Sequence, residues 1–341
     1  MFILGIDVGK SHLHCRLLKS TEQGTQKQST TKLGNIQIFQ NTEEGRLRLT
    51  QWLEGYQALG NTTHAVMEAT GVYSQQIAHT LHSLSCKVSV VNAAKIKFFA
   101  MSNLRRGKTD SMDAELIAQY GLTMKPAPWT PTRLELEHLR ALLSEREGII
   151  GLITMEKGRH HAFAHHQQPC KKALERCETR QKLLKEQLDS VELDIKDIIK
   201  ADPILKGQVG LLTSVPGVGR LTAATLLAET HHLEDLQNAG QWASFAGLSP
   251  VPRQSGQMMG RSSISKVGNP RIRKILYMSA VTVTRMDNEQ GEFYRRLVGS
   301  GKPKKVALIA LARKILRVCF AVLRSGEPYT KGHRSQLALP A

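Results

Sequence analysis

Short apolar runs alternate with amphipathic segments through the first 122 residues of the chain, and this alternation restricts its possible folds more than any other feature. The apolar runs suit buried strands, whereas the intervening segments carry apolar residues at helical spacing. Strands that alternate with helices indicate an α/β domain with a mixed sheet. We expect strands at 2–8, 11–18, 36–40, 64–70 and 87–92, and helices at 42–59, 72–84 and 110–122.

The sequence changes character after PAPWTP at residues 126–131. The segment 132–200 is charged and rich in leucine, with apolar residues three and four apart, which predicts two long helices bent near 167–169. Compact sequence resumes after Asp202-Pro203, and the arm before it would serve as a spacer or an oligomerisation element. We predict a first domain at 1–125, a coiled-coil-like helical arm at 126–203, a mainly helical second domain at 204–330 and a tail at 331–341.

The chain is basic, and its charge is unevenly distributed. Its 341 residues include 47 Lys and Arg against 29 Asp and Glu, a formal charge of +18. From Val251 to Ala341, 18 basic residues stand against 4 acidic ones. This balance favours a polyanionic partner over a neutral small substrate and predicts a phosphate-binding surface in the last quarter. A solvated basic face is the alternative.

Cysteine usage and hydropathy indicate the compartment. The five cysteines are an odd number without a CxxC pair, so neither a disulfide framework nor a zinc ribbon is indicated. The first apolar run reaches a charge at Asp7, too early for a signal-peptide core, and no later run approaches membrane-spanning length. We therefore expect a cytoplasmic protein with reduced thiols and no membrane partner.

Four carboxylates lie where strands end or a helix begins. Asp7 and Glu68 each follow an apolar strand, and Asp110 and Asp113 lie three residues apart on one helix face. Clustered carboxylates repel one another unless they share cations, and hard oxygen ligands suit Mg²⁺, with Mn²⁺ as the alternative. Two such ions about 3.5–4 Å apart stabilise the attacking and leaving oxygens of a phosphodiester displacement. Each residue alone also has a structural reading, as a turn, strand-end or helix-terminus carboxylate.

Three segments around these carboxylates carry a family resemblance. GIDVGK, MEATGVY and GKTDSMDAELIA resemble the motifs of the DEDD insertion-sequence transposases, the family of the pilin-gene invertases and the bridge-RNA-guided recombinases. The resemblance implies a ribonuclease-H-like catalytic domain similar to the RuvC junction resolvase, with metal ligands at Asp7, Glu68, Asp110 and Asp113. It also implies a DNA recombinase guided by a structured RNA, with the protein reading nucleic-acid shape and backbone.

A second block, FAGLSPVPRQSGQMMGRSSISKVGNPRIRKILYMSA, resembles the part of this family in which a serine before a glycine attacks DNA and forms a phosphoserine link. By that resemblance the nucleophile is Ser255; on chemistry alone Ser262, Ser263 and Ser265 are alternatives. No histidine lies near enough in sequence to activate the hydroxyl. We therefore expect activation from the carboxylate site, in a composite centre assembled between protomers.

Three further features bear on nucleic-acid contact. SVPGVGRLTAATLLAE resembles a helix-hairpin-helix, whose backbone N–H groups approach a DNA phosphate, although a plain glycine turn fits too and the hairpin could meet protein or RNA. HHAFAHH lacks the acidic or cysteine ligands of a metal site, so exposure or nucleic-acid contact is expected there. Six basic residues around the serine are predicted to hold the scissile phosphate, with a solvated loop as the alternative: Arg253, Arg261, Lys266, Arg271, Arg273 and Lys274.

The leading hypothesis is thus a Mg²⁺-dependent transposase or site-specific recombinase that binds donor DNA, target DNA and a structured RNA at the bacterial nucleoid. Two strand exchanges need at least two active centres, which predicts a homodimer or homotetramer. A junction resolvase or nuclease that uses water is the enzymatic alternative. An actin-like kinase is disfavoured because the chain lacks a P-loop pattern, and a non-catalytic DNA-binding protein would bind without metal or cleavage.

Overall fold

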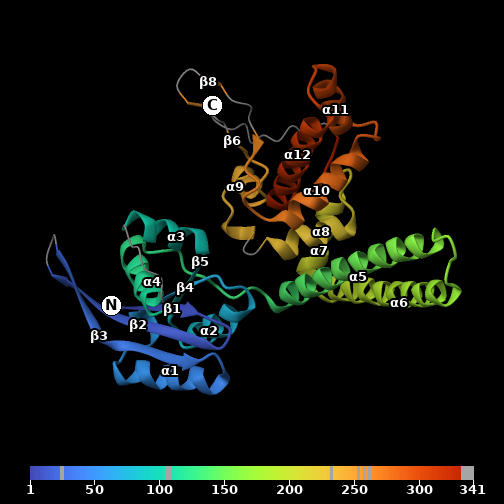
Figure 1. Cartoon of the computed structure of the whole chain (residues 1–341). Helices are drawn as coiled ribbons and strands as arrows, with labels where there is room; N and C mark the ends of the chain where they lie inside the picture. Colours follow the sequence, from blue (N-terminus) through green and yellow to red (C-terminus); the bar gives the residue numbers. More distant parts are fainter. Residues whose placement is uncertain are drawn as a thin grey trace. The chain divides into compact units, whose positions relative to one another are not determined.

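The computed structural model describes residues 1–23, 27–103, 110–230, 233–251, 254–255, 258–259 and 263–331. The chain divides into two compact units, Met1–Pro131 and Thr132–Ala341, whose elements are labelled in Figure 1. The helical arm expected at 126–203 falls almost wholly within the second unit. The finer domain limits drawn from the sequence stay predictions.

A five-stranded mixed sheet forms the centre of the first unit. Its strand order is β3-β2-β1-β4-β5, with β1 antiparallel to β2 and parallel to β4. This is the ribonuclease-H-like arrangement, so the predicted α/β fold is confirmed. Strands β2 and β3 are longer than expected, because their pairing continues to Gln23 and Lys27. The strands are β1 (Phe2–Val8), β2 (His12–Gln23), β3 (Lys27–Gln40), β4 (Thr63–Glu68) and β5 (Lys87–Val91).

Helices cover both faces of the sheet (Figure 1). Alternate strand residues point to opposite faces, and Leu4, Ile6 and their neighbours pack with α1 (Glu43–Gly55) and α2 (Val72–Ser83). On the other face Val66 packs with α3 (Ala93–Ser102) and α4 (Asp110–Met124). Helix α3 was not predicted, because AAKIKFFAMS is apolar on most of its circumference and shows no clear helical periodicity.

Helix α4 packs unusually close to β1, and glycine makes this possible. A Cβ atom on Gly5 would lie 2.3 Å from the carbonyl oxygen of Ala114 and 2.4 Å from the backbone nitrogen of Ala118. A Cβ on Gly121, farther along α4, would meet Val66 at 2.7 Å. The helix backbone therefore rests directly on the two central strands, which fixes the height of its first turn above the sheet.

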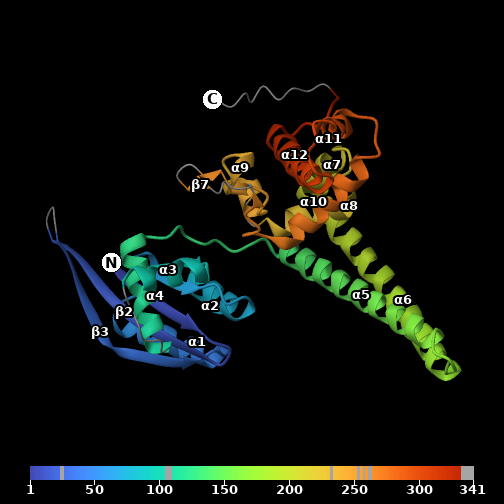
Figure 2. The same ribbon diagram turned by 45° about the horizontal axis from the view of Figure 1, so that its top comes forward.

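The second unit begins with the predicted pair of long helices. Helices α5 (Leu134–Ala164) and α6 (Lys171–Ala201) pack side by side along their length (Figure 2). The reversal between them, at 165–170, contains the bend expected near 167–169. Glu156 is buried in this pair, where Arg180 and Arg159 form ion pairs with its carboxylate at 2.7 and 2.8 Å.

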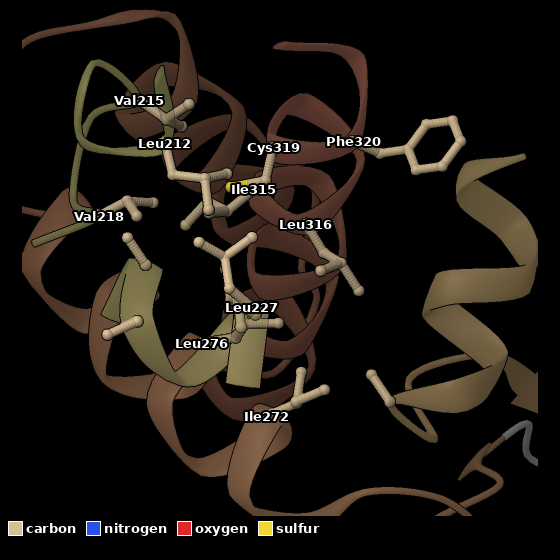
Figure 3. Packing of buried hydrophobic residues seen from close by; sticks show 14 of the residues in the cluster. Leu212, Val215, Val218, Leu227, Ile272, Leu276, Ile315, Leu316, Cys319 and Phe320 are labelled. Carbon is tan, nitrogen blue, oxygen red and sulfur yellow. The ribbon is translucent and has the colours of Figure 1, made fainter. Parts of the chain in front are cut away.

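The rest of the second unit is a helical bundle around one hydrophobic core (Figure 3). Leu212, Leu227, Leu276 and Ile315 come from four different helices and are fully buried or nearly so. No helix of the described residues is long and apolar enough to cross a membrane. The helices are α7 (Pro203–Thr213), α8 (Arg220–Glu229), α9 (Ala239–Phe245), α10 (Pro270–Val283), α11 (Glu289–Gly299) and α12 (Lys304–Ser325).

Candidate active site

The register of the two central strands brings Asp7 and Glu68 together. In the parallel pair of β1 and β4, Ile6 lies opposite Met67, so the next residue on each strand is one of these two carboxylates. Both share a face with Gly5 and Val66 by the two-residue period of a strand, and this is the face that α4 covers. The carboxyl ends of the strands are where α/β sheets bind ligands.

Helix α4 runs against β1 in the opposite direction, with its first turn toward the same edge. Ala114 contacts Gly5, and Gly121 lies nearer the start of the strand, beside Ile3. From Gly5 to Asp7 a strand advances about 6.6 Å, and from Ala114 back to the first residue of α4 a helix covers about 6 Å. The start of α4 is therefore level with Asp7.

The two aspartates of α4 occupy this first part of the helix. Asp113 precedes Ala114 and is half-buried. Asp110 is the first residue of α4, and its side chain lies outside the described part of the structure. The positive end of the helix dipole lies here, which favours negative charge. The backbone thus places the positions of the four predicted ligands at one edge of the sheet.

The described carboxylates do not by themselves form a metal-binding cluster. Among the described side chains, no three His, Cys, Asp or Glu groups are near enough to hold a metal ion, and the side chain of Asp110 lies outside the described residues. The donor set nevertheless fits a hard divalent cation, because it offers carboxylate oxygens alone. Two residues beyond Glu68, the hydroxyl of Thr70 is buried without a hydrogen-bond partner in the described structure, which suits a polar ligand at this edge.

Two neighbours of Asp7 on β2 complete this part of the site. His14 lies directly opposite Asp7 in the antiparallel register and is half-buried, so it shares the face of α4. The sequence pattern HLHC predicted a strand but gave no reason to associate His14 with the carboxylates. Cys15 points to the other face, where burial and then the charge of Asp7 raise the pKa of its thiol. That thiol is protonated at neutral pH and is no nucleophile.

Polar contacts hold the edge in place. The side-chain amide of Asn41 donates to the carbonyl oxygens of Gly9, at 3.0 Å, and Tyr73, at 3.1 Å, and so joins the turn after β1 to the first turn of α2. On α4, Glu115 forms ion pairs with Arg16 at 3.4 Å and Lys32 at 2.6 Å. These bonds link α4 to β2 and β3 and keep its first turn at the edge.

Ser255 lies in a β-hairpin of the second unit. Strand β6 (Pro250–Val251) pairs with β9 (Ser263–Ile264), and β7 (Gln254–Ser255) pairs with β8 (Met258–Met259). These are two separate two-stranded antiparallel sheets. Ser255 is thus the last residue of β7 and lies opposite Met258 in this pairing.

Three of the six basic residues predicted to bind phosphate already bind other groups of the second unit. Arg271 donates to Glu229 and Ser144, both at 2.8 Å, Lys274 forms an ion pair with Glu147 at 2.6 Å, and Arg273 donates to the carbonyl oxygens of Ala246 and Gly268. Lys266, two residues after β9, is exposed, whereas Arg253 and Arg261 lie outside the described residues.

Glu229 explains why Arg271 is held. Its side chain is only 3% exposed. Burial raises the pKa of this carboxyl, but hydrogen bonds from Arg271 and Asn269, together with the charge of Arg140, outweigh burial and lower it. Glu229 is therefore ionised at neutral pH, and Arg271 and Arg140 compensate its buried negative charge. The pair joins α8 to α10 and leaves Arg271 little freedom to bind DNA.

We expect Arg271→Gln to destabilise the second unit by about 2 kcal/mol, below the range for a fully buried pair because Arg140 and Asn269 still bind Glu229. Lys266→Gln, which removes an exposed charge from the same region, should leave stability unchanged. Thermal unfolding of the two variants measures the difference. Equal melting temperatures would show that Arg271 is free to serve another role.

The α7–α8 hairpin forms an open hollow on the second unit. Gly217, in the turn, has φ of +80°, a conformation that favours glycine. The N-terminus of α8 has no side-chain cap, so its first backbone N–H groups are available. The hollow has a volume of about 450 Å³ and is lined by this turn and by hydroxyls of α8 and α10, among them Thr222, Ser279 and Thr282.

The histidines of HHAFAHH lie at the far end of α5. His161 stacks on His165 with ring centroids 4.0 Å apart, and His160 lies 3.2 Å from Glu178. Within the part of the chain that the structure describes, these groups form no metal-binding cluster. The side chains of His161, His165 and His166 are exposed, which agrees with the exposure expected from the sequence.

Comparison with known proteins identifies the class and then the family. Residues 4–166 match a transposase model of the DEDD type, and residues 209–295 match the transposase family of IS116, IS110 and IS902. The chain is 31% identical to the pilin gene-inverting proteins of Moraxella bovis and Moraxella lacunata over 332 residues, which span 96% of this chain and 97% of each relative. It therefore belongs to the IS110-type transposase family and is an enzyme of DNA recombination.

Two further similarities are partial. A protein of the insertion element IS110 from Streptomyces coelicolor is 33% identical over 144 residues, which span 42% of this chain and 35% of that protein. The RuvC structure from Thermus thermophilus covers 38% of this chain and 99% of its own, with 13% identity and a TM-score of 0.29. That score is too low to support an inference, and the fold rests on the strand order and register given above.

Proposed function

We propose that the chain cuts and rejoins DNA at the carboxylate edge with the help of a divalent metal. The observation that carries this is the register of β1 and β4, which sets Asp7 beside Glu68 on the face that α4 covers. Asp7, Glu68, Asp110 and Asp113 would hold Mg²⁺, which neutralises charge on the phosphate and on the attacking and leaving oxygens when bound.

Ser255 is the proposed nucleophile. Its Oγ attacks the phosphorus of one phosphodiester, the bond from phosphorus to a deoxyribose oxygen breaks, and that oxygen leaves as a hydroxyl after accepting the serine proton. The product is a phosphoserine diester. Attack by another deoxyribose hydroxyl reverses the step and rejoins a strand, so the number of phosphodiester bonds is conserved. A place on β7, within the basic last quarter of the chain, suits a residue that must reach a DNA backbone.

Binding of the nucleic acid is assigned to the second unit. The basic last quarter of the chain supplies charge, with Lys266 and, from the sequence, Arg253 and Arg261 around the serine. The α7–α8 hairpin would act as a helix-hairpin-helix, with the uncapped N–H groups of α8 on a phosphate. A structured RNA would guide the reaction, and the active assembly would be a homodimer or homotetramer.

Ser255→Ala tests the serine. Labelled DNA incubated with the wild-type protein and Mg²⁺ should give a protein–DNA adduct on a denaturing gel, and the variant should give none. Ser265→Ala is the matched control, because Ser265 lies in the same region and its hydroxyl donates to the carbonyl oxygen of Val267 at 3.4 Å. The control should form the adduct at the wild-type rate.

Two outcomes would overturn parts of the proposal. An adduct that persists in Ser255→Ala refutes the serine, and free DNA ends without any adduct indicate a nuclease that uses water. The guide is tested by sequencing the nucleic acid that copurifies with the protein. A single defined RNA supports guidance, and protein that recombines DNA after complete ribonuclease treatment refutes it.

A further inference from the structure

Helix α3 presents an apolar and basic face to solvent. Phe98 and Met101, about one turn apart, are 66% and 61% exposed, and Lys95 precedes Phe98 by one turn on the same side. On the inner side Ile96 is buried, and Phe99 meets Tyr120 of α4 edge-on, with ring centroids 5.3 Å apart. The helix is thus anchored by one face while a phenylalanine ring points outward from the other.

This outer face adjoins the carboxylate edge. The last residue of β5, Val91, pairs with Glu68, and the next residue, Asn92, is the N-cap of α3. The Asn92 side chain accepts a hydrogen bond from the backbone of Ala94 at 2.8 Å, which fixes the start of the helix at the strand end. Because α3 also packs on α4, its outer face continues from the edge where the proposed reaction takes place.

The charge of the helix restricts the kind of partner. Residues 92–103 contain two lysines and no acidic residue, and Lys95 and Lys97 are both exposed. An exposed aromatic ring beside ammonium groups is the combination with which proteins bind a nucleic-acid strand, since bases stack on the ring and phosphates approach the cations. A protein partner that covered Phe98 alone would gain nothing from these lysines.

We propose that the outer face of α3 binds a DNA strand next to the phosphate on which the carboxylate edge acts. One unstacked base lies on the ring of Phe98, and the flanking phosphates approach Lys95 and Lys97. Met101 extends the apolar surface under the next nucleotide. This assignment rests on the proposed function, because it takes the substrate of the carboxylate edge to be DNA.

The test measures DNA binding by the full-length protein without cleavage, in an Asp7→Asn background. The probe is a fluorescein-labelled single-stranded oligodeoxynucleotide, followed by anisotropy. Phe98→Ala should weaken binding about tenfold, since stacking of one base contributes roughly 1–3 kcal/mol. Phe98→Trp should keep the affinity, and the fluorescence of the new tryptophan should fall when DNA binds. Lys95→Gln and Lys97→Gln should each lower the salt dependence of log K by about 0.7.

Leu47→Ala is the matched control, because Leu47 is 58% exposed on α1, which covers the other face of the sheet. It should bind the probe as the parent does. Unchanged DNA affinity in Phe98→Ala overturns the proposal. It is also overturned if the variant loses affinity only for an RNA of the same sequence, or if only its oligomeric state changes. Failure of the proposed function is distinguishable from this, because it would appear as DNA cleavage by Asp7→Asn. The binding measurement itself does not depend on cleavage.

Discussion

Asp7→Asn is expected to abolish DNA cleavage and strand transfer while DNA affinity stays near the wild-type value. Asparagine keeps the size of the side chain but removes one anionic oxygen from the metal site. Changes to groups that merely orient metal ligands cost about 10- to 100-fold in activity, so loss of a ligand should cost more than about 100-fold. Strand transfer is measured on labelled DNA with Mg²⁺, and affinity with the same DNA in Ca²⁺.

Glu43→Gln serves as the control for this variant. It removes one negative charge, as Asp7→Asn does, from an exposed position in the first turn of α1, on the other face of the sheet. Activity should be unchanged. If Asp7→Asn retained activity within about tenfold of the wild type, the carboxylate edge would not be the reaction centre, whatever the family of the chain.

Gly5→Ala is expected to disable the same site without touching a carboxylate. The new methyl group would lie 2.3 Å from the oxygen of Ala114 and 2.4 Å from the nitrogen of Ala118, and both are backbone atoms of α4 that no rotamer change can move. The helix must shift away from β1, and its first turn with Asp113 moves with it. Overpacking of this kind costs about 1–3 kcal/mol or more, and DNA cleavage should fall with it.

Thermal unfolding and strand transfer together measure this effect. Gly55→Ala, at the end of α1, is the matched control, because a Cβ there meets nothing within 4 Å. It should keep the wild-type melting temperature and activity. A Gly5→Ala protein that is as stable and active as this control would show that the contact between α4 and β1 does not position the site.

The first unit could be predicted from the sequence to a large extent, because its strands are apolar runs with a clear beginning and end. Asp7 and Glu68 could be predicted as metal ligands for the same reason, since each lies at the end of such a run, and this assignment stays a prediction. The helix of Asp113 was recognisable from its sequence, but the depth of its packing depends on Gly5, more than 100 residues away in the chain. Helix α3 was missed, because large apolar residues lie on its exposed side, as Phe98 and Met101 do, as well as on its buried side, so no helical periodicity stands out.

The contacts of the basic residues in the second unit could not be predicted from the sequence. Arg271 and Lys274 were assigned to phosphate because they lie near Ser255 in the chain. Their ion-pair partners, Glu229 and Glu147, are 42 and 127 residues earlier, and only the fold brings them together. Local charge therefore predicted a basic surface, but it could not separate the cations that hold the bundle from those left for a ligand.

Iron-directed cleavage of the protein backbone tests the metal site most directly. Fe²⁺ replaces Mg²⁺ at sites of oxygen ligands, and with ascorbate and peroxide it generates radicals that cut the chain beside the ion. We expect cuts near residues 7, 68 and 110–113, suppressed by excess Mg²⁺ and absent from Asp7→Asn. Cuts confined to the histidines of α5, or no localised cuts in the wild-type protein, would contradict a metal centre at the carboxylate edge.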